Sequence, residues 1–260
     1  MSAFVVNWHW LSVAALTSAS FGYLSATTRL LFMGLRRYKT AKDIPNSMFQ
    51  RGSKLKGVVV SVGDGDNIRI FHRPFLFRFL GIARHPVLKK RLGEETISVR
   101  LAGVDAPECA HFGAPGQEGG EQAKKWLGNY LKDRAVTVQL HSLDQYSRAV
   151  CTVYVRKGIL RLKKNVSHEL VKVGHAVVYR GFGAEYNGIL KKLETAETQA
   201  RKRKIGMWSI RNKPVISPQE YKRALKEGRV SESVTEKDFF DRNPENLFSF
   251  LFRSDKRSFF

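Results

Sequence analysis

Two arginines and three carboxylates stand where expected strands begin, end or turn, and their chemistry suits the hydrolysis of a phosphodiester bond. One strand carries Arg100 and runs into Asp105 and Glu108. Asp66 lies in a hairpin turn, and Arg148 begins a later strand. This hydrolysis needs a nucleophilic water, a hard cation or base to activate it, and positive charge for the phosphoryl oxygens. Carboxylates are ligands that calcium and magnesium prefer, and a guanidinium group matches phosphate oxygens.

The residue types alone leave this chemistry open. Side chains alternate along a strand, so Arg100 is expected on the opposite face from Leu101 and Gly103, where it can face the same cleft as the end of the strand. An aspartate and a glutamate beside an arginine are, however, also typical of a surface ion pair. From the residues alone, both interpretations stand.

The elements that must position these residues are short strands and helices that do not alternate one by one. The expected strands are a hairpin within Lys54–Ile70, broken at residues 63–66, and then Thr96–Val104, Val136–Leu140 and Ala149–Val155. The expected helices are Glu118–Leu131, Ser167–Val173 and Tyr186–Lys204. This order favours the α+β class, with a five-stranded Greek-key β-barrel of the OB-fold kind and about three helices.

An insertion over residues 72–95 separates the hairpin from the next strand. It mixes aromatic and aliphatic residues with arginine and lysine, as in Phe75–Leu80. This composition suits contact with a membrane surface or with nucleic acid. A hydrophobic lid packed on the domain is an equal alternative.

The N-terminal segment has the composition of a membrane anchor. No Lys, Arg, Asp or Glu occurs from Ser2 to Thr28, and about twenty helical residues cross a bilayer core. Arg29 and Arg36 follow, and by the positive-inside rule they keep the remaining chain on the side where it is made. A secretory signal is disfavoured because no positive charge precedes the apolar run. Since no acidic residue precedes Asp43, a mitochondrial address also fits, and we expect a single-pass membrane protein of the mitochondrion.

The overall charge favours a polyanionic partner. Lys and Arg number 45 against 23 Asp and Glu, which gives a formal net charge of +22. This balance suits nucleic acid or an anionic membrane surface, and a charged surface without a specific partner is the alternative. The two cysteines, Cys109 and Cys151, are too few for a disulfide framework and lack the paired spacing of a zinc site.

Several spaced motifs resemble the thermonuclease (staphylococcal nuclease-like) family. They are residues 62–67 (VGDGDN), 99–108 (VRLAGVDAPE), 144–148 (DQYSR), 173–179 (VGHAVVY) and 206–208 (GMW). Their order along the chain is more specific than any one of them. The N-terminal segment, the insertion after His72 and residues 110–113 (AHFG) look most similar to the fungal membrane-anchored mitochondrial members.

The resemblance implies an OB barrel whose site holds one calcium ion. The family's metal-ligand aspartates fall on Asp66 and Asp105, with the carbonyl of Ala106 as a further oxygen. Its catalytic residues fall on Arg100, Glu108 and Arg148. By analogy, Glu108 would orient or deprotonate the attacking water, and the two arginines would hold the phosphate and stabilise the transition state.

This chain departs from the bacterial pattern at a few positions. Asn67 and Ala106 stand where the bacterial enzyme has threonines, and Gln145 replaces a lysine near the phosphate. Contacts to phosphate or base are therefore expected to be weaker or differently distributed. Tyr146 and Tyr179 fall near positions that pack against the nucleotide in the family, although a core role is an equal alternative for Tyr179.

We therefore expect a calcium-dependent endonuclease with low sequence specificity, acting on DNA or RNA and tethered to a membrane. Its parts would be an anchor (1–35), a linker (36–53), the OB domain (54–208) and a charged, flexible tail (209–260). One alternative is a catalytically inactive OB module that binds nucleic acid at a membrane. Another is a basic protein that coats anionic lipid.

Overall fold

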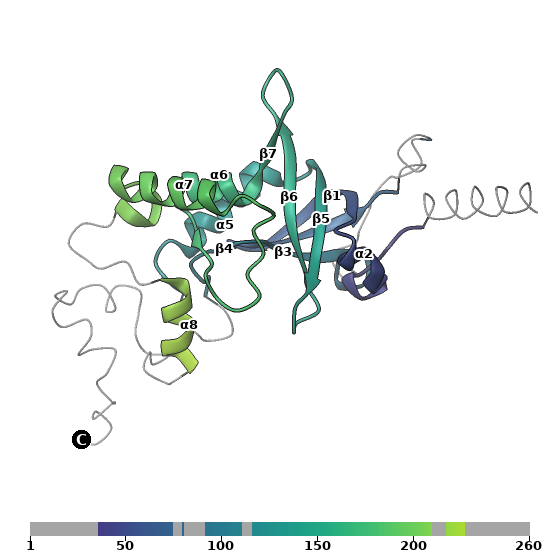
Figure 1. The fold of residues 1–260 in the computed structure, drawn as a ribbon, viewed down its shortest axis with the longest axis horizontal. Coiled ribbons are helices and arrows are strands. Elements are labelled where there is room, and N and C mark those ends of the chain that lie inside the picture. The colour runs from purple at the N-terminus through teal and green to yellow at the C-terminus, as the bar shows by residue number, and fades with distance from the viewer. Residues whose placement is uncertain (1–35, 75–79, 81–91, 111–115, 210–216, 227–260) are drawn as a thin grey trace, which may run out of the picture. The chain divides into compact units, whose positions relative to one another are not determined.

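The computed structural model describes residues 36–74, 80, 92–110, 116–209 and 217–226 (Figure 1). The chain divides into two compact units, residues 1–37 with 73–84, and residues 38–72 with 85–260. All of the helices and strands described below belong to the second unit.

Five strands close into a barrel. They are β1 (Lys54–Asp64), β2 (Asn67–His72), β3 (Ile97–Leu101), β5 (Ala135–Leu143) and β6 (Ala149–Lys157). Antiparallel pairing links β3 to β2, β2 to β1, β1 to β5 and β5 to β6. A parallel pairing between β3 and β6 completes the ring. The predicted OB-like fold of the α+β class is confirmed in this part of the chain.

The alternation of side chains in β3 places Arg100 on the face opposite the barrel core. Ile97, Val99 and Leu101 are buried in the barrel, whereas Arg100 is only partly buried. Arg100 is therefore on the opposite face from Leu101, as predicted. In the parallel ladder Arg100 is registered with Val150, which comes two residues after Arg148.

Three helices match the predicted ones closely: α5 (Gly120–Leu131), α6 (Val166–Lys172) and α7 (Leu190–Arg203) (Figure 1). Helix α5 buries Ala123, Leu127 and Leu131 at the spacing of one helical face. Helix α6 begins where the Asn165 side chain accepts a hydrogen bond from the His168 amide. Helices α6 and α7 pack against each other.

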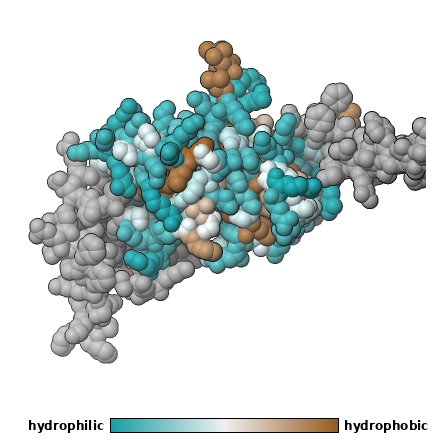
Figure 2. Space-filling model, in the orientation of Figure 1, coloured by the Kyte–Doolittle hydropathy of each residue, from teal (hydrophilic) through white to brown (hydrophobic). Residues whose placement is uncertain are grey.

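Other elements extend this plan. The strand predicted over 96–104 is interrupted at Gly103, whose φ of 75° suits glycine, and β4 (Val104–Asp105) pairs instead with β8 (Val177–Val178). Strand β7 (Leu162–Asn165) extends β6 into a long hairpin. Figure 2 shows hydrophobic side chains projecting at its tip, where Ile159 and Leu160 are almost fully exposed. Short helices are α4 (Leu92–Glu95) and η3 (Gly206–Ser209).

The segment predicted as a linker and part of the predicted flexible tail are folded. Residues 41–50 form η1 (Ala41–Asp43) and α2 (Asn46–Gln50), and Tyr38, Ile44 and Phe49 are buried in the core. The tail contributes α8 (Pro218–Lys226). Helix α2 has only five residues, too few to show helical periodicity. Helix α8 has nine residues with its apolar side chains on one face, and sequence reasoning missed it.

The predicted membrane anchor, residues 1–35, and most of the insertion, residues 75–79 and 81–91, lie outside the described residues. Within the residues that are described, no helix is long and apolar enough to cross a membrane.

The turn between β1 and β2 packs so tightly that Gly65 has no room for a side chain. A Cβ at Gly65 would lie 2.6 Å from the Cβ of Ala106, whereas a Cβ at Gly128 in α5 meets nothing within 4 Å. We expect Gly65→Ala to lower the free energy of unfolding by about 1–3 kcal/mol through overpacking. Gly128→Ala should raise it by about 0.5–1 kcal/mol through helix propensity. Urea unfolding of both variants checks this, and equal effects would contradict the packing argument.

Candidate active site

Arg100 joins two buried carboxylates at the end of the barrel. Asp66, in the turn between β1 and β2, is 7% exposed, and Asp105, in β4, is 1% exposed. The Nε atom of Arg100 lies 3.6 Å from Asp66 Oδ2, and its Nη2 atom lies 3.4 Å from Asp105 Oδ1. Asp66 is distant in the sequence from Arg100 and Asp105, and the fold brings the three side chains together.

Backbone pairing holds this arrangement in place. The Leu101 amide donates a hydrogen bond to the Asp66 carbonyl at 2.9 Å. This bond adjoins the paired residues Asn67 of β2 and Arg100 of β3. Asp105 is held from the other side, because it pairs with Val177 in β8. Asp105 is thus held in a strand ladder, and Asp66 is held by a main-chain hydrogen bond next to one.

Glu108 lies just beyond β4 and is held through its main chain. Its carbonyl accepts a hydrogen bond from the Gln117 amide at 2.7 Å, and the close approach of α5 there is allowed because Gly120 has no side chain. The Glu108 side chain is 26% exposed. Burial raises the pKa of Glu108, which Lys222 opposes. A raised pKa suits a carboxylate that takes a proton near neutral pH.

The electrostatic environment of Asp66 is unfavourable for a lone carboxylate. Burial raises the pKa of Asp66 to about 6, although Arg100 and Lys222 pull it down. The negative charges of Asp105 and Asp64 raise it further. A positive ion at this position would relieve the repulsion among these carboxylates.

Sequence reasoning missed Lys222 and gave Asp64 no role. The Nζ atom of Lys222 lies 2.7 Å from Asp105 Oδ1 and 2.6 Å from Glu108 Oε1. Asp64 Oδ1 accepts a hydrogen bond from the Gly65 amide at 2.7 Å. The paired aspartates of the hairpin turn were a usable signal for Asp64. Lys222 gave none, because it is separated from Asp105 by 117 residues.

The structure does not pair Arg148 with the central carboxylates. Its Nε atom donates to Asp144 Oδ2 at 2.6 Å, and its Cζ atom lies 5.3 Å from the centre of the Tyr146 ring. The Tyr146 side chain is 67% exposed. Strand register nevertheless puts Arg148 on the side of the barrel that Arg100 occupies, because it precedes Val150 by two residues.

Tyr179 lies beside the central cluster. Its ring centre is 5.4 Å from the Cζ atom of Arg100, and the ring is partly buried. The Tyr186 hydroxyl donates to the Tyr179 carbonyl at 2.6 Å, and the Tyr179 amide donates to Gly103. Of the two tyrosines predicted near the nucleotide, the structure places Tyr179 by Arg100 and Tyr146 by Arg148.

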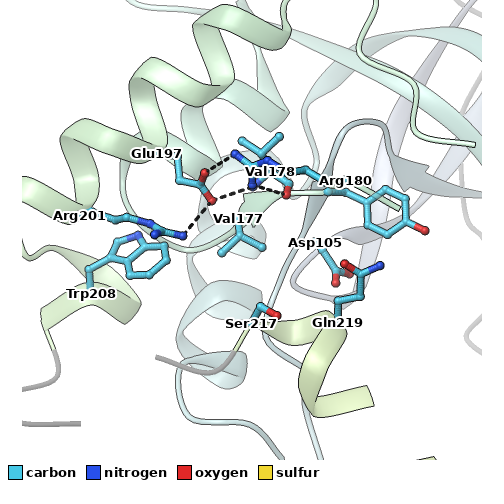
Figure 3. A pocket seen from close by; sticks show the side chains of 10 residues that line it. Asp105, Val177, Val178, Arg180, Glu197, Arg201, Trp208, Ser217 and Gln219 are labelled. Atoms are coloured by element: carbon cyan, nitrogen blue, oxygen red, sulfur yellow. Dashed lines mark hydrogen bonds and ion pairs between the residues drawn. The ribbon is translucent and has the colours of Figure 1, made fainter. Parts of the chain in front are cut away.

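A cavity of about 150 Å³ opens next to Asp105 (Figure 3). Its wall contains the buried Glu197, which pairs with Arg180 at 2.9 Å and with Arg201 at 3.7 Å. Glu197 also accepts a hydrogen bond from the Val178 amide at 3.1 Å. These bonds tie β8 to α7 and so support the strand that holds Asp105. The remaining lining residues are Val177, Tyr179, Trp208, Ser217 and Gln219.

The donor set fits a hard cation with an incomplete protein cage. Asp66 and Asp105 supply buried carboxylate oxygens, and the Ala106 carbonyl comes next along the chain. No cluster of three or more His, Cys, Asp or Glu able to hold a metal occurs in the part of the chain that the structure describes. Calcium takes six to eight oxygen ligands, so water and substrate phosphate would have to complete its shell.

Comparison with known proteins identifies related chains. Residues 98–210 match the family described as "Staphylococcal nuclease homologue". The chain is 43% identical over 187 residues to "Endonuclease Htp3" of Saprolegnia parasitica, covering 72% of this chain and 84% of that protein. It is 46% identical over 201 residues to "Probable endonuclease lcl3" of Emericella nidulans, covering 72% and 71%. It is 38% identical over 216 residues to "Probable endonuclease LCL3" of Candida dubliniensis, covering 82% and 88%.

The raised pKa of Asp66 predicts how stability changes with pH. The pKa of Asp66 in the folded protein, about 6, exceeds the ordinary value of 3.8. The contribution of Asp66 to the free energy of unfolding is therefore fully present below pH 4 and is lost as pH rises through 6. With metal chelated, Asp66→Asn should match wild type near pH 4 and be more stable at pH 8 by up to about 3 kcal/mol. Urea unfolding of wild type and variant across this pH range measures the difference. Asp133→Asn, which changes an exposed aspartate, is the control. A difference that does not change with pH would contradict the account.

Proposed function

Because the chain belongs to the family of staphylococcal nuclease homologues, we propose that it is a metal-dependent endonuclease that hydrolyses phosphodiester bonds in DNA or RNA. The observation that carries the proposal is Arg100 between the buried Asp66 and Asp105, with Glu108 beside them. This set provides oxygen ligands, positive charge and a carboxylate base in one place. The names of its relatives as endonucleases support the same conclusion.

The two arginines would act on the phosphate. Arg100 is oriented by Asp66 and Asp105, and Arg148 by Asp144. An oriented guanidinium loses little freedom when it binds phosphate oxygens, and its fixed charge stabilises the negative charge that develops on them. Arg148 lies at the turn before β6, where it would approach the phosphate from another side than Arg100.

Glu108 would orient the attacking water and accept its proton. Its pKa is raised by burial, which brings its basicity closer to the working pH than that of an exposed glutamate. When bound between Asp66 and Asp105, calcium would polarise a phosphoryl oxygen and lower the pKa of bound water. Both aspartates would hold the ion and keep it beside the Arg100 guanidinium.

The proposed substrate is nucleic acid read mainly through its backbone. The net charge of +22 favours attraction to any polyanion. Tyr146 exposes a ring next to Arg148, which suits stacking on a base whose phosphate the arginine holds. Backbone contacts and stacking carry little sequence information, so we propose low sequence specificity.

Cleavage by site variants tests the proposed function. The full chain in detergent should cut labelled DNA or RNA with calcium and stop when calcium is chelated. Glu108→Gln and Arg148→Ala should each lower the single-turnover rate by about 100-fold or more. Matched controls are Glu94→Gln and Arg156→Ala, which change exposed residues of α4 and β6 and should retain the wild-type rate.

Two outcomes of this assay would count against the proposal. Cutting that survives both Glu108→Gln and Arg148→Ala would place the active site elsewhere. Tight, salt-sensitive binding without cutting by the wild-type chain would indicate the inactive nucleic-acid-binding module instead.

We also propose that the protein is tethered to a mitochondrial membrane. Residues 2–28 contain no Lys, Arg, Asp or Glu. The exposed Ile159 and Leu160 lie among basic residues of the β6–β7 hairpin, a combination suited to an anionic lipid surface.

We expect the full chain to stay in the membrane pellet after alkaline carbonate extraction of mitochondria. Removal of residues 1–35 should release it, and release of the intact chain would contradict the tether.

A further inference from the structure

Helix α8 has a capped N-terminus and one buried face, and it packs beside the proposed active site. Ser217 begins it with a reciprocal cap: its amide and hydroxyl donate to Glu220 Oε2 at 3.0 and 2.9 Å, and the Glu220 amide donates to Ser217 Oγ at 3.2 Å. Tyr221 is 2% exposed and Ala224 is 7% exposed, so one face of the helix is buried. Figure 3 shows Ser217 and Gln219 of this segment near Asp105.

Between the two buried positions of α8, Lys222 points its ammonium group at the catalytic carboxylates. It forms charge-assisted contacts with Asp105 Oδ1 at 2.7 Å and Glu108 Oε1 at 2.6 Å. These two contacts place the positive charge of Lys222 between the carboxylates of Asp105 and Glu108.

This position conflicts with the two tasks proposed for the same carboxylates. Asp105 Oδ1 already accepts from Arg100 Nη2 at 3.4 Å, so the ammonium takes a lone pair that a divalent cation would use. A dication near this oxygen would also be repelled by the ammonium charge. Glu108, with its Oε1 paired to Lys222, is held away from accepting a proton from water.

We propose that α8 is an autoinhibitory helix and that Lys222 is an internal competitor of the divalent cation. The Lys222 ammonium neutralises Asp105 and Glu108 while no metal is bound, and it withdraws when the cation binds. The helix thus sets the cation concentration at which the site becomes competent. This inference rests on the proposed function, because it assigns the same carboxylates to cation and water.

Calcium affinity, measured without substrate, tests the inference. Isothermal titration of the full chain in detergent gives the dissociation constant for wild type and Lys222→Met. The substitution should tighten calcium binding by roughly 10-fold, within the range of ordinary coupling between sites. Arg223→Met removes the same charge from an exposed neighbour on α8, and it should change the affinity less than about 2-fold.

A second variant tests the helix independently of its lysine. Tyr221→Ala removes the buried anchor of α8 and leaves Lys222 in the chain, so it should also tighten calcium binding. Urea unfolding confirms that each variant is folded. Because this substitution leaves the Lys222 side chain unchanged, its effect reports docking of the helix.

The outcomes separate this inference from the proposed function. If wild type binds calcium and cuts nucleic acid while Lys222→Met binds calcium no more tightly, the inference alone fails. The same holds if Lys222→Met lowers cleavage at saturating calcium without changing affinity, since Lys222 would then act on substrate. If Lys222→Met tightens calcium binding but no variant cuts, competition stands and the proposed function fails. If no variant binds calcium, both fail.

Discussion

The burial of two like charges, Asp66 and Asp105, is the constraint on which the rest of the site depends. Removing a carboxylate from water costs several kcal/mol, and placing two together adds repulsion. The fold offsets this cost with Arg100, which contacts both aspartates, and with Lys222, which contacts Asp105. The raised pKa of Asp66 indicates that the compensation is incomplete. A region that is costly for metal-free folding is suited to binding a cation.

Closure of the barrel makes this arrangement rigid. The parallel pairing of β3 with β6 sets the register between the strand of Arg100 and the strand that Arg148 precedes. Gly103 allows the chain to leave β3 and pair again as β4, which carries Asp105. The buried Glu197 then links β8 to α7 through Val178 and Arg180. Asp66, Arg100 and Asp105 are thus each held by elements that are distant in sequence.

The sequence was most informative where local periodicity is strong. The β1–β2 hairpin and helices α5, α6 and α7 agree with the predicted ranges, because alternation and helical spacing are local properties. Helix α2 is too short for such a pattern, whereas Ser217, Pro218 and Glu220 were a usable local signal for the start of α8 that sequence reasoning missed. Motif resemblance predicted Asp66, Arg100, Asp105 and Glu108 as one site, and the structure places their side chains close together, with Lys222 joining Glu108 to Asp105. It could not place Lys222, which reaches the site from a helix outside those motifs.

The most direct test of the central claim is calcium-dependent cleavage by wild type and Asp105→Asn. The initial rate of cutting of labelled DNA is measured with the full chain over a range of calcium concentrations, each buffered with a chelator. The account predicts that wild type saturates with calcium, and that Asp105→Asn requires much more calcium and cuts more slowly. Equal cutting by wild type with and without free divalent cation, or an unchanged calcium dependence in Asp105→Asn, would contradict a cation held by this carboxylate cluster.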